Sequence, residues 1–515
     1  MTEKNLFAIF SPILGEKLDY PSILLDKTIQ VDNGNIYRKY GEVHRRLMRL
    51  ADMLNSGGTK SQTPDANPIL HYHTFIKRST AMQYFLAFTK KNIYCWNVAN
   101  KVWDLKFTCQ SNCTEWDTIT YNDKIIATNN IDMVLVWDTT GYFMPLQNTT
   151  PTNITAVTGG ATINRTDIAF VDGGVGEDTI TTVAGNFVTA GFAAGNSIKI
   201  TGSASNNGTY TIVSVVALTI NVATGLLTAE AAGASVTIEN GNPCQVTAAT
   251  HGLTTGDRVF IKNCGGMVQI NNLQFVVTVI DVNKFTLNGI NSSTYTTYTS
   301  GGTVIEFQGI EYSAGLYLTK AKYVTTFENY LLLGWTTENG VMYPQRERWN
   351  CIANETDWKS AGSGAKETEG HDRIVGFKIY DGVLIIFKEK KRIAQTLVPT
   401  TAIWNWSVLP GNIGCMSNHS IVEDADGRVY WLADDLSIRE MQVGEISKDI
   451  DPIVKLIEPS MAYLTYGIYI EETGEIWWSI PYDNALPNKV ITVKGLSNWG
   501  ELDLAVSCFG SYKEA

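Results

Sequence analysis

The sequence predicts an all-β protein: a β-propeller of about six blades, with two small β-barrel-like modules inserted in tandem and a short N-terminal helix. Three observations support this prediction. A polar turn followed by a strand rich in aromatic and β-branched residues recurs with a period of roughly 45–50 residues. A stretch of different composition interrupts the period, and that stretch repeats itself.

The chain has 515 residues, of which 44% are hydrophobic and 18% charged, a composition typical of well-packed globular proteins. Its net charge of −11 disfavours a surface that grips phosphates, although it allows a passage through which DNA slides. The first 22 residues resemble no secretory signal, and no apolar run reaches the roughly 20 residues of a membrane span. The eight Cys form no CxxC pair, so we expect reduced thiols.

Residues 1–60 are predicted to form an arm that contains an amphipathic helix over residues 41–55. Apolar residues recur there at helical spacing, basic residues occupy the other side, and two glycines follow as a stop signal. These residues are Val43, Leu47, Leu50 and Leu54; Arg45, Arg46 and Arg49; and Gly57 and Gly58. Two interpretations remain open: a packed helix with a solvated basic side, or an element that docks on an acidic partner or on DNA.

Residues 61–151 and 307–515 are predicted to form the propeller. Its repeated hairpin turns are marked by Asp123, Asn329, Gly382, Gly427 and Gly474. The last three steps between markers are 53, 45 and 47 residues, and the first step of 206 becomes 51 once a 155-residue insert is subtracted. The remaining 360 residues therefore allow about six blades. Two Trp-Asp pairs resemble WD repeats, but the companion Gly-His is missing, so that family is not expected.

Residues 152–306 are predicted to form the insert, as one module over 152–241 and a second over 242–306. This stretch has only five basic and nine acidic residues, and all 13 Trp lie outside it. Gly191 and Gly195 in the first half match Gly252 and Gly256 in the second at an offset of 61 residues. Both halves show the alternation and turns of small β modules.

No sequence motif indicates catalysis or a cofactor. Phosphate loops, HExxH, GxSxG and EF-hand loops are missing from the sequence. His71 and His73 share one strand face but lack a third ligand nearby, and Cys109 and Cys113 have no His or Cys companion, so we predict no metal site. The acidic clusters at 423–426 and 434–435 fit turn chemistry. The prediction is therefore a non-enzyme without catalytic, cofactor-binding or metal-binding residues.

Within the insert, Pro243 to Asp257 and the following Asn271-Asn272 closely resemble a module that recurs in bacteriophage tail proteins. That module is likened to the first catalytic-cysteine half-domain fold of ubiquitin-activating enzymes. Phe192 to Ala232 resembles another phage structural module. Outside the insert, the order of short motifs resembles the propeller of the tail nozzle, or tail tubular protein, of short-tailed phages. These motifs include Asp19–Ser22, Arg346–Trp349, Gly411–Cys415 and Leu496–Trp499.

This resemblance implies a structural virion protein, made in the host cytoplasm, whose copies form a ring, usually a hexamer. The ring would lie below the head–tail adaptor, continue the channel for double-stranded DNA without binding it specifically, and anchor fibres or spikes. Two alternatives stay open. One is a receptor-binding or fibre protein, and the other a propeller glycosidase or lyase acting on host polysaccharide, which requires a central cluster of carboxylates.

Overall fold

The computed structural model describes residues 5–9, 36–39, 42–45, 63–147, 151–158, 162–240, 243–400 and 402–513. It divides into two compact units, each treated by itself below. The first unit joins Met1–Asn148 with Gln308–Ala515, and the second is Thr149–Phe307. Nearly all regular structure in the described residues is β-strand, which confirms the predicted fold class.

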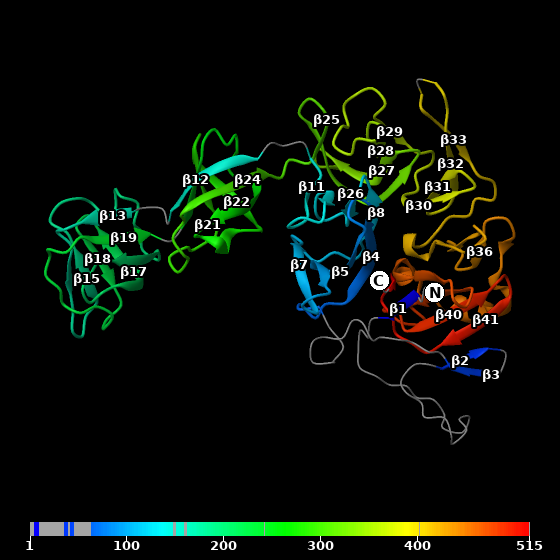
Figure 1. Ribbon diagram of the computed structural model, residues 1–515, viewed down its shortest axis with the longest axis horizontal. Coiled ribbons are helices and arrows are strands. Elements are labelled where there is room, and N and C mark those ends of the chain that lie inside the picture. The colour runs from blue at the N-terminus through cyan, green and yellow to red at the C-terminus, as the bar shows by residue number, and fades with distance from the viewer. Residues whose placement is uncertain are drawn as a thin grey trace, which may run out of the picture. The chain divides into compact units, whose positions relative to one another are not determined.

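The first unit contains six antiparallel sheets, which form the blades of a propeller (Figure 1). Blade 1 consists of β4 (Ile69–Lys77), β5 (Met82–Thr89), β6 (Asn92–Asn97) and β7 (Val102–Thr108). Blade 2 consists of β8 (Asp117–Tyr121), β9 (Lys124–Thr128), β10 (Leu135–Trp137) and β11 (Met144–Pro145). Blade 3 consists of β25 (Ile310–Ser313), β26 (Leu316–Phe327), β27 (Tyr330–Glu338), β28 (Val341–Trp349) and β29 (Gly364–Glu367).

The remaining three blades follow without interruption in the chain. Blade 4 consists of β30 (Ile374–Tyr380), β31 (Val383–Lys388), β32 (Arg392–Leu397) and β33 (Trp404–Val408). Blade 5 consists of β34 (Val422–Glu423), β35 (Val429–Leu432), β36 (Ile438–Glu440) and β37 (Gly444–Glu445). Blade 6 consists of β38 (Tyr466–Ile470), β39 (Glu475–Ile480), β40 (Lys489–Lys494) and β41 (Asn498–Leu502).

Short helical turns join blades 4, 5 and 6. They are η4 (Asn418–Ser420), η5 (Ser447–Ile450), α1 (Asp451–Val454) and η6 (Pro459–Leu464). Among the described residues, none of the helices is both long and apolar enough to cross a bilayer.

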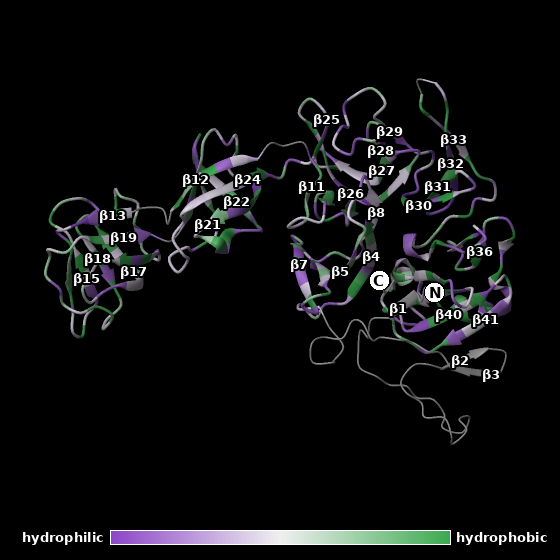
Figure 2. Cartoon of the chain, in the orientation of Figure 1, coloured by the Kyte–Doolittle hydropathy of each residue, from purple (hydrophilic) through white to green (hydrophobic). Residues whose placement is uncertain are grey.

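The blades form a closed ring, because every pair of neighbouring blades shares an apolar core. Five buried clusters join blades 1 through 6 in sequence. A sixth joins the last blade to the first and includes Tyr72 and Phe85 of blade 1 with Trp477 of blade 6. Each blade packs on a neighbour with both faces, so alternate residues of one strand, such as Ile125 and Ile126 of β9, belong to different interblade cores. Hydrophobic residues accordingly recur along the blade strands (Figure 2). Six blades are what the repeat period predicts.

The turn residues that mark the period all adopt left-handed backbone conformations. Each lies in the turn between two paired strands of its blade, the first and second strands in all blades but blade 3, where Asn329 lies between β26 and β27. The φ angles of Asp123, Asn329, Gly382, Gly427 and Gly474 are 60°, 62°, 72°, 76° and 65°. Asn, Asp and Gly tolerate this region best. The sequence period therefore reflects a backbone requirement that recurs in blades 2 to 6.

The N-terminal helix predicted over residues 41–55 is wrong at the positions that the structure describes. Residues Glu42–Arg45 form the strand β3, which pairs with β2 (Ile36–Lys39), and β2 pairs in turn with the edge strand β41. The open edge of blade 6 supplies backbone partners that override helical periodicity. Residues 46–55 of the predicted helix lie outside the described residues. A separate two-stranded sheet in the first unit is formed by β1 (Asn5–Ile9) and β42 (Phe509–Lys513).

The second unit contains a closed six-stranded barrel and a curved seven-stranded sheet. The barrel is formed by β12 (Thr152–Thr158), β20 (Cys244–Ala248), β21 (Arg258–Gly265), β22 (Leu273–Asp281), β23 (Lys284–Leu287) and β24 (Ser300–Glu306), with the turn η3 (Val268–Ile270). The sheet is formed by β13 (Thr162–Arg165), β14 (Ala169–Val171), β15 (Asp178–Thr181), β16 (Ser197–Thr201), β17 (Gly208–Val216), β18 (Thr219–Val222) and β19 (Val236–Asn240).

The strand β12 corrects the expected module boundary at residue 152. It pairs with β20 and β24 and thus belongs to the second module, not the first. A barrel closes only when its last edge is paired, and β12 supplies that pairing from before the first module. The seven-stranded sheet is therefore inserted within the barrel module.

The two modules share a loop-to-strand contact at the second of the two glycines that the sequence repeat matches. In the first, the N–H of Gly195 donates to the carbonyl of Ile212 at 2.8 Å. In the second, the N–H of Gly256 donates to the carbonyl of Val277 at 2.9 Å. Both glycines have positive φ, at 83° and 102°, so the repeat reflects one backbone arrangement built twice.

Candidate axial site of the propeller

Polar aromatic residues gather where the first strands of the blades approach one another. His71 and His73 come from β4, Tyr466 from β38, and His419 from the turn η4. Contacts among β4, β8, β26, β30, η4 and β38 show that these elements are neighbours. We call the side chains at this position the axial site. Sequence reasoning found only the pair of histidines on β4.

Hydrogen bonds connect the two histidines of β4 to the neighbouring blades. The His71 Nδ1 lies 2.9 Å from the Tyr466 hydroxyl, and its Nε2 lies 2.7 Å from Thr118 Oγ1. The His73 Nδ1 lies 2.8 Å from the same Thr118 oxygen, and its Nε2 lies 3.0 Å from Thr120 Oγ1. One hydroxyl donates one proton and accepts two, so Thr118 can bridge both imidazoles.

A stack of rings continues from this network. His419 stacks on Tyr466 with ring centroids 4.6 Å apart, and on His71 at 5.0 Å. The His419 Nε2 lies 2.7 Å from the carbonyl oxygen of Trp116, and a carbonyl only accepts, so Nε2 carries the proton. Next to His419, Gly376 of β30 leaves room for Asn418: a Cβ at that glycine would lie 2.1 Å from Asn418 Oδ1.

Burial keeps the axial histidines neutral near pH 7. It lowers the pKa of His73 to about 4. Burial also lowers the pKa of His71 well below its usual range, helped by the nearby His419 and His73. The same cause lowers the pKa of His419. Neutral imidazoles offer one donor and one acceptor each, which suits the bridging pattern observed.

Two carboxyl groups lie at the start of the adjoining strand β8: Asp117 on the strand and Glu115 two residues before it. Burial, aided by the charge of Glu115, raises the pKa of Asp117 to about 7. The two Asp117 oxygens accept the N–H groups of Thr118 at 3.0 Å and Val324 at 2.9 Å. Glu115 pairs with Lys322 at 3.0 Å. Both carboxyl groups thus already have partners within the protein.

The other residues singled out in the sequence lie elsewhere and have local partners. Cys113 Sγ lies 3.3 Å from the carbonyl of Lys90, and both Cys109 and Cys113 are buried. Asp424 accepts the N–H groups of Asp426 and Arg428, each at 2.9 Å, as in a turn. In the part of the chain that the structure describes, no three His, Cys, Asp or Glu residues are arranged to hold a metal.

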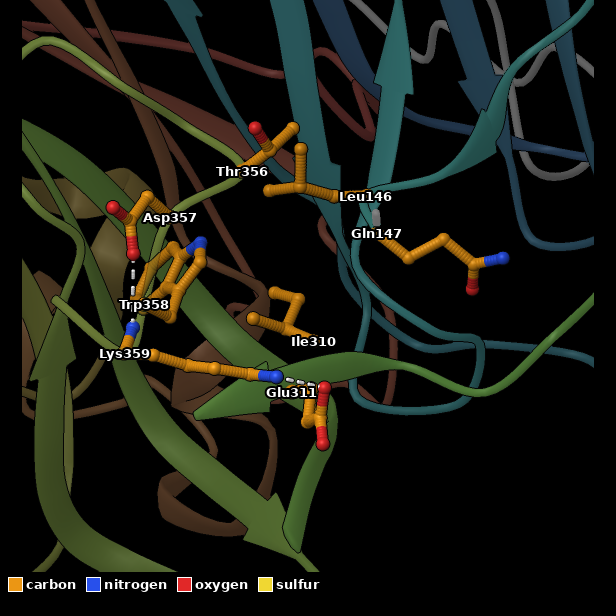
Figure 3. Close-up of a pocket in the computed structure, with 8 residues that line it drawn as sticks. All are labelled: Leu146, Gln147, Ile310, Glu311, Thr356, Asp357, Trp358 and Lys359. Carbon is orange, nitrogen blue, oxygen red and sulfur yellow. Dashed lines mark hydrogen bonds and ion pairs between the residues drawn. The ribbon is translucent and has the colours of Figure 1, made fainter. Parts of the chain in front are cut away.

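A small pocket lies beside the point where the insert leaves the propeller (Figure 3). Its volume is about 100 Å³, and it is lined by Leu146, Gln147, Ile310, Glu311, Thr356, Asp357, Trp358 and Lys359. Two of these lining residues, Lys359 and Glu311, form an ion pair. Pockets for small molecules measure roughly 300–1,000 Å³, so this one suits a few waters.

One family and several solved structures are similar to this chain. Residues 241–308 match the ubiquitin-activating enzyme E1 FCCH domain, which confirms the likeness expected for the second module. No curated protein matches the sequence.

Among solved structures, KlHsv2 with loop 6CD replaced by a Gly-Ser linker is 8% identical, over 87% of this chain and 98% of that one, with a TM-score of 0.26. The phage phi92 endosialidase is 13% identical over 88% of this chain and 59% of that one, with a TM-score of 0.28. Apo AztD from Citrobacter koseri is 11% identical over 84% and 97%, with a TM-score of 0.26. Similarities this low say nothing about what this chain binds or does.

Proposed function

We propose that this chain is a structural protein of a bacteriophage tail, of the nozzle type, whose copies form a ring around the path of the genome. The observation that supports the proposal most is the combination of a closed propeller with an inserted FCCH-type barrel in one chain. The sequence resemblances support it in two parts: the barrel is similar to a module of phage tail proteins, and the propeller motifs are similar to those of tail nozzle proteins, from which the doubled and early insert departs. The role in anchoring fibres or spikes, the contact with a head–tail adaptor and the location in a virion belong to the same proposal.

In this proposal the DNA passes through the opening between subunits of the oligomer and not through the centre of any one propeller. His71, His73 and Tyr466 bridge neighbouring inner strands at the propeller axis through hydrogen bonds of 2.7–3.0 Å. Passage of a duplex would require these bonds and the blade cores to separate. Subunits that meet head to tail around a rotation axis leave a central opening instead. An acidic chain with net charge −11 would not retain phosphates by counterion release.

The test is electron microscopy of the purified full chain with symmetry classification, alongside mass measurement in solution. Rings with an axial opening that admits a duplex are the expected result. Where the free chain stays monomeric, the same imaging is repeated on the chain extracted with intact tails. Monomers in solution together with no ring in tails would overturn the proposal, and three-fold elongated particles would favour a fibre protein.

A second candidate function, glycan hydrolysis, is supported by one observation. Asp117 and Glu115 place two carboxyl groups close together, and burial with the charge of Glu115 raises the pKa of Asp117 to about 7. A carboxyl that is protonated near neutral pH can act as a general acid, and glycosidases use two carboxyl groups. Release of reducing ends from bacterial polysaccharides, lost in an Asp117→Asn variant that still folds, would favour this function. Turnover that survives in Asp117→Asn would assign the activity to another site.

A further inference from the structure

Two buried cysteines lie together at the joint between blades 1 and 2. Cys109 follows β7, the last strand of blade 1, and Cys113 precedes β8, the first strand of blade 2. These cysteines are 4% and 3% exposed and belong to the apolar core that the two blades share. The two side chains interact with each other through a hydrogen bond. We call them the thiol pair.

The backbone holds the two cysteines of the thiol pair side by side. The N–H of Cys109 donates to the carbonyl of Lys91, and the N–H of Cys113 donates to the carbonyl of Lys90, both at 2.8 Å. Consecutive residues have Cα atoms about 3.8 Å apart, so the two cysteines are anchored to adjacent points. A disulfide needs cysteine Cα atoms within roughly 4.4–6.8 Å of each other, and this anchoring favours that approach.

Polar groups around the thiol pair orient its sulfur atoms. The Cys113 thiol donates to the carbonyl of Lys90 at 3.3 Å. The Cys109 sulfur accepts the Asn129 Nδ2–H at 3.9 Å, and the Cys109 thiol also interacts with the Asp132 carboxylate. The hydrogen bond with Cys113, burial and the charge of Asp132 together raise the pKa of Cys109. Cys109 is therefore protonated at neutral pH and lies next to a carboxylate that can accept its proton.

A short exposed loop joins the two cysteines of the thiol pair. Its residues Gln110, Ser111 and Asn112 are all exposed. The N–H of Gln110 attaches the loop by donating to Asp132 Oδ1 at 3.0 Å. Exposed loops open locally at a smaller free-energy cost than core strands do. Opening of this loop alone therefore admits a small oxidant to the thiols while the blades stay folded.

We propose that Cys109 and Cys113 form a disulfide within the chain when a hydroperoxide, such as hydrogen peroxide, oxidises them. One sulfur attacks a peroxide oxygen, the O–O bond breaks, and a sulfenic acid forms as one water leaves. The other sulfur then attacks the sulfenic sulfur, and the S–S bond forms as a second water leaves. The two thiols lose two electrons and two protons, which reduce one peroxide to two waters.

The occasion for this oxidation rests on the proposed function. A chain assembled in a reducing host cytoplasm keeps its thiols and meets such oxidants only after its release. The disulfide would then link the end of blade 1 to the start of blade 2. The bond itself needs only one folded chain, so it does not depend on the formation of a ring.

The test treats the folded full chain with hydrogen peroxide, unfolds it, blocks the remaining thiols and maps its peptides by mass spectrometry. The expected product is a peptide in which Cys109 and Cys113 are joined, lighter by two hydrogen atoms than its reduced form. A dithiol reductant should restore both thiols. The variants Cys109→Ala and Cys113→Ala, treated separately, should lose the joined peptide entirely.

Cys95→Ser is the matched control. Cys95 lies in the same apolar core and is 6% exposed, so its replacement perturbs the same part of the fold without removing a member of the thiol pair. This variant should give the joined peptide to the same extent as the wild type. Thermal unfolding before treatment verifies that the three variants fold.

Thiols that stay intact at both positions in the treated wild type would overturn the inference. So would a sulfinic acid, or a bond between two chains, in place of the joined peptide. A joined peptide that appears only after oxidation in denaturant would overturn it as well, since contact in the folded chain would not be its cause. Rings without the disulfide leave the proposed function standing while this inference fails, and the disulfide without rings gives the reverse.

Discussion

At the propeller axis, burial determines the charge of the ionisable side chains more than their neighbours do. It is the largest influence on the pKa of His71, His73, His419 and Asp117, lowering the first three and raising the fourth. All four effects favour the neutral form. Neutral imidazoles and hydroxyls can then bridge the inner strands without an ion being desolvated.

The half-buried histidines of the axial site make the stability of the propeller sensitive to acid. The pKa of His73 is about 4 in the folded state and about 6.5 in an unfolded chain. Between these values the unfolded state binds more protons, so stability falls as the pH drops from about 6.5 to 4. We expect His73→Gln to reduce the loss of Tm between pH 7 and pH 4.5. The same scan on His371→Gln, at an exposed position, should follow the wild type.

Glu347 on β28 gives the opposite pH dependence. Burial raises its pKa to about 8, while its Oε1 accepts a hydrogen bond from Trp406 Nε1 at 2.6 Å. The folded state then binds more protons than the unfolded state between about pH 4.3 and 8, so stability falls as the pH rises through that window.

Glu347→Gln removes this titration and keeps the acceptor for Trp406. We expect its Tm to equal that of the wild type within a few degrees near pH 5 and to exceed it increasingly up to pH 8–9. Calorimetry across this range measures the difference. A constant offset at every pH would show that Glu347 does not titrate there.

At the scale of elements, the joint between the last and first blades differs from the other five. The chain returns there through residues 503–513, and the Ser507 hydroxyl and the Cys508 thiol both donate to the carbonyl of Ile69 on β4. Phe509 then packs with Tyr466 and Trp477, at ring-centroid distances of 6.3 and 6.4 Å. Packing at Phe509 therefore joins the last blade to the first, next to a blade 6 sheet that the N-terminal strands β2 and β3 extend.

Phe509→Ala is expected to destabilise the propeller by about 3 kcal/mol, because Phe509 is only 4% exposed and its removal leaves a cavity. All 13 Trp lie outside the insert, so Trp fluorescence during denaturant unfolding reports on the propeller alone. Leu397→Ala, at a position 47% exposed, is the control and should change stability by less than about 0.5 kcal/mol. Equal effects of the two variants would argue against closure at Phe509.

The sequence predicts elements well where one local rule repeats. Asp123, Gly427 and the other markers revealed the blades because each hairpin needs a left-handed residue at the same place. The axial site cannot be predicted from such a local rule, because His71 and Tyr466 are 395 positions apart in the sequence. Only closure of the ring brings these two side chains together. Strand β12 was assigned to the wrong module for a similar reason: its partners β20 and β24 lie beyond an inserted sheet.

At the scale of the whole molecule, the insert and the propeller are built to fold separately. The second unit has two apolar cores of its own. In the first unit, the Gln147 side-chain oxygen accepts the N–H groups of Gln308 at 3.2 Å and Gly309 at 3.4 Å. The two ends of the insert are therefore held together by the propeller itself, as expected for a module inserted into a complete domain.

Replacement of residues 149–307 by a short Gly-Ser linker should leave the propeller intact. The linker has only to span two chain ends that already lie side by side, and the six interblade cores contain no residue of the insert. We expect the Trp fluorescence transition to stay within a few degrees of the wild-type Tm. Ring formation should persist. A shortened chain that fails to unfold cooperatively would show that the propeller needs the insert.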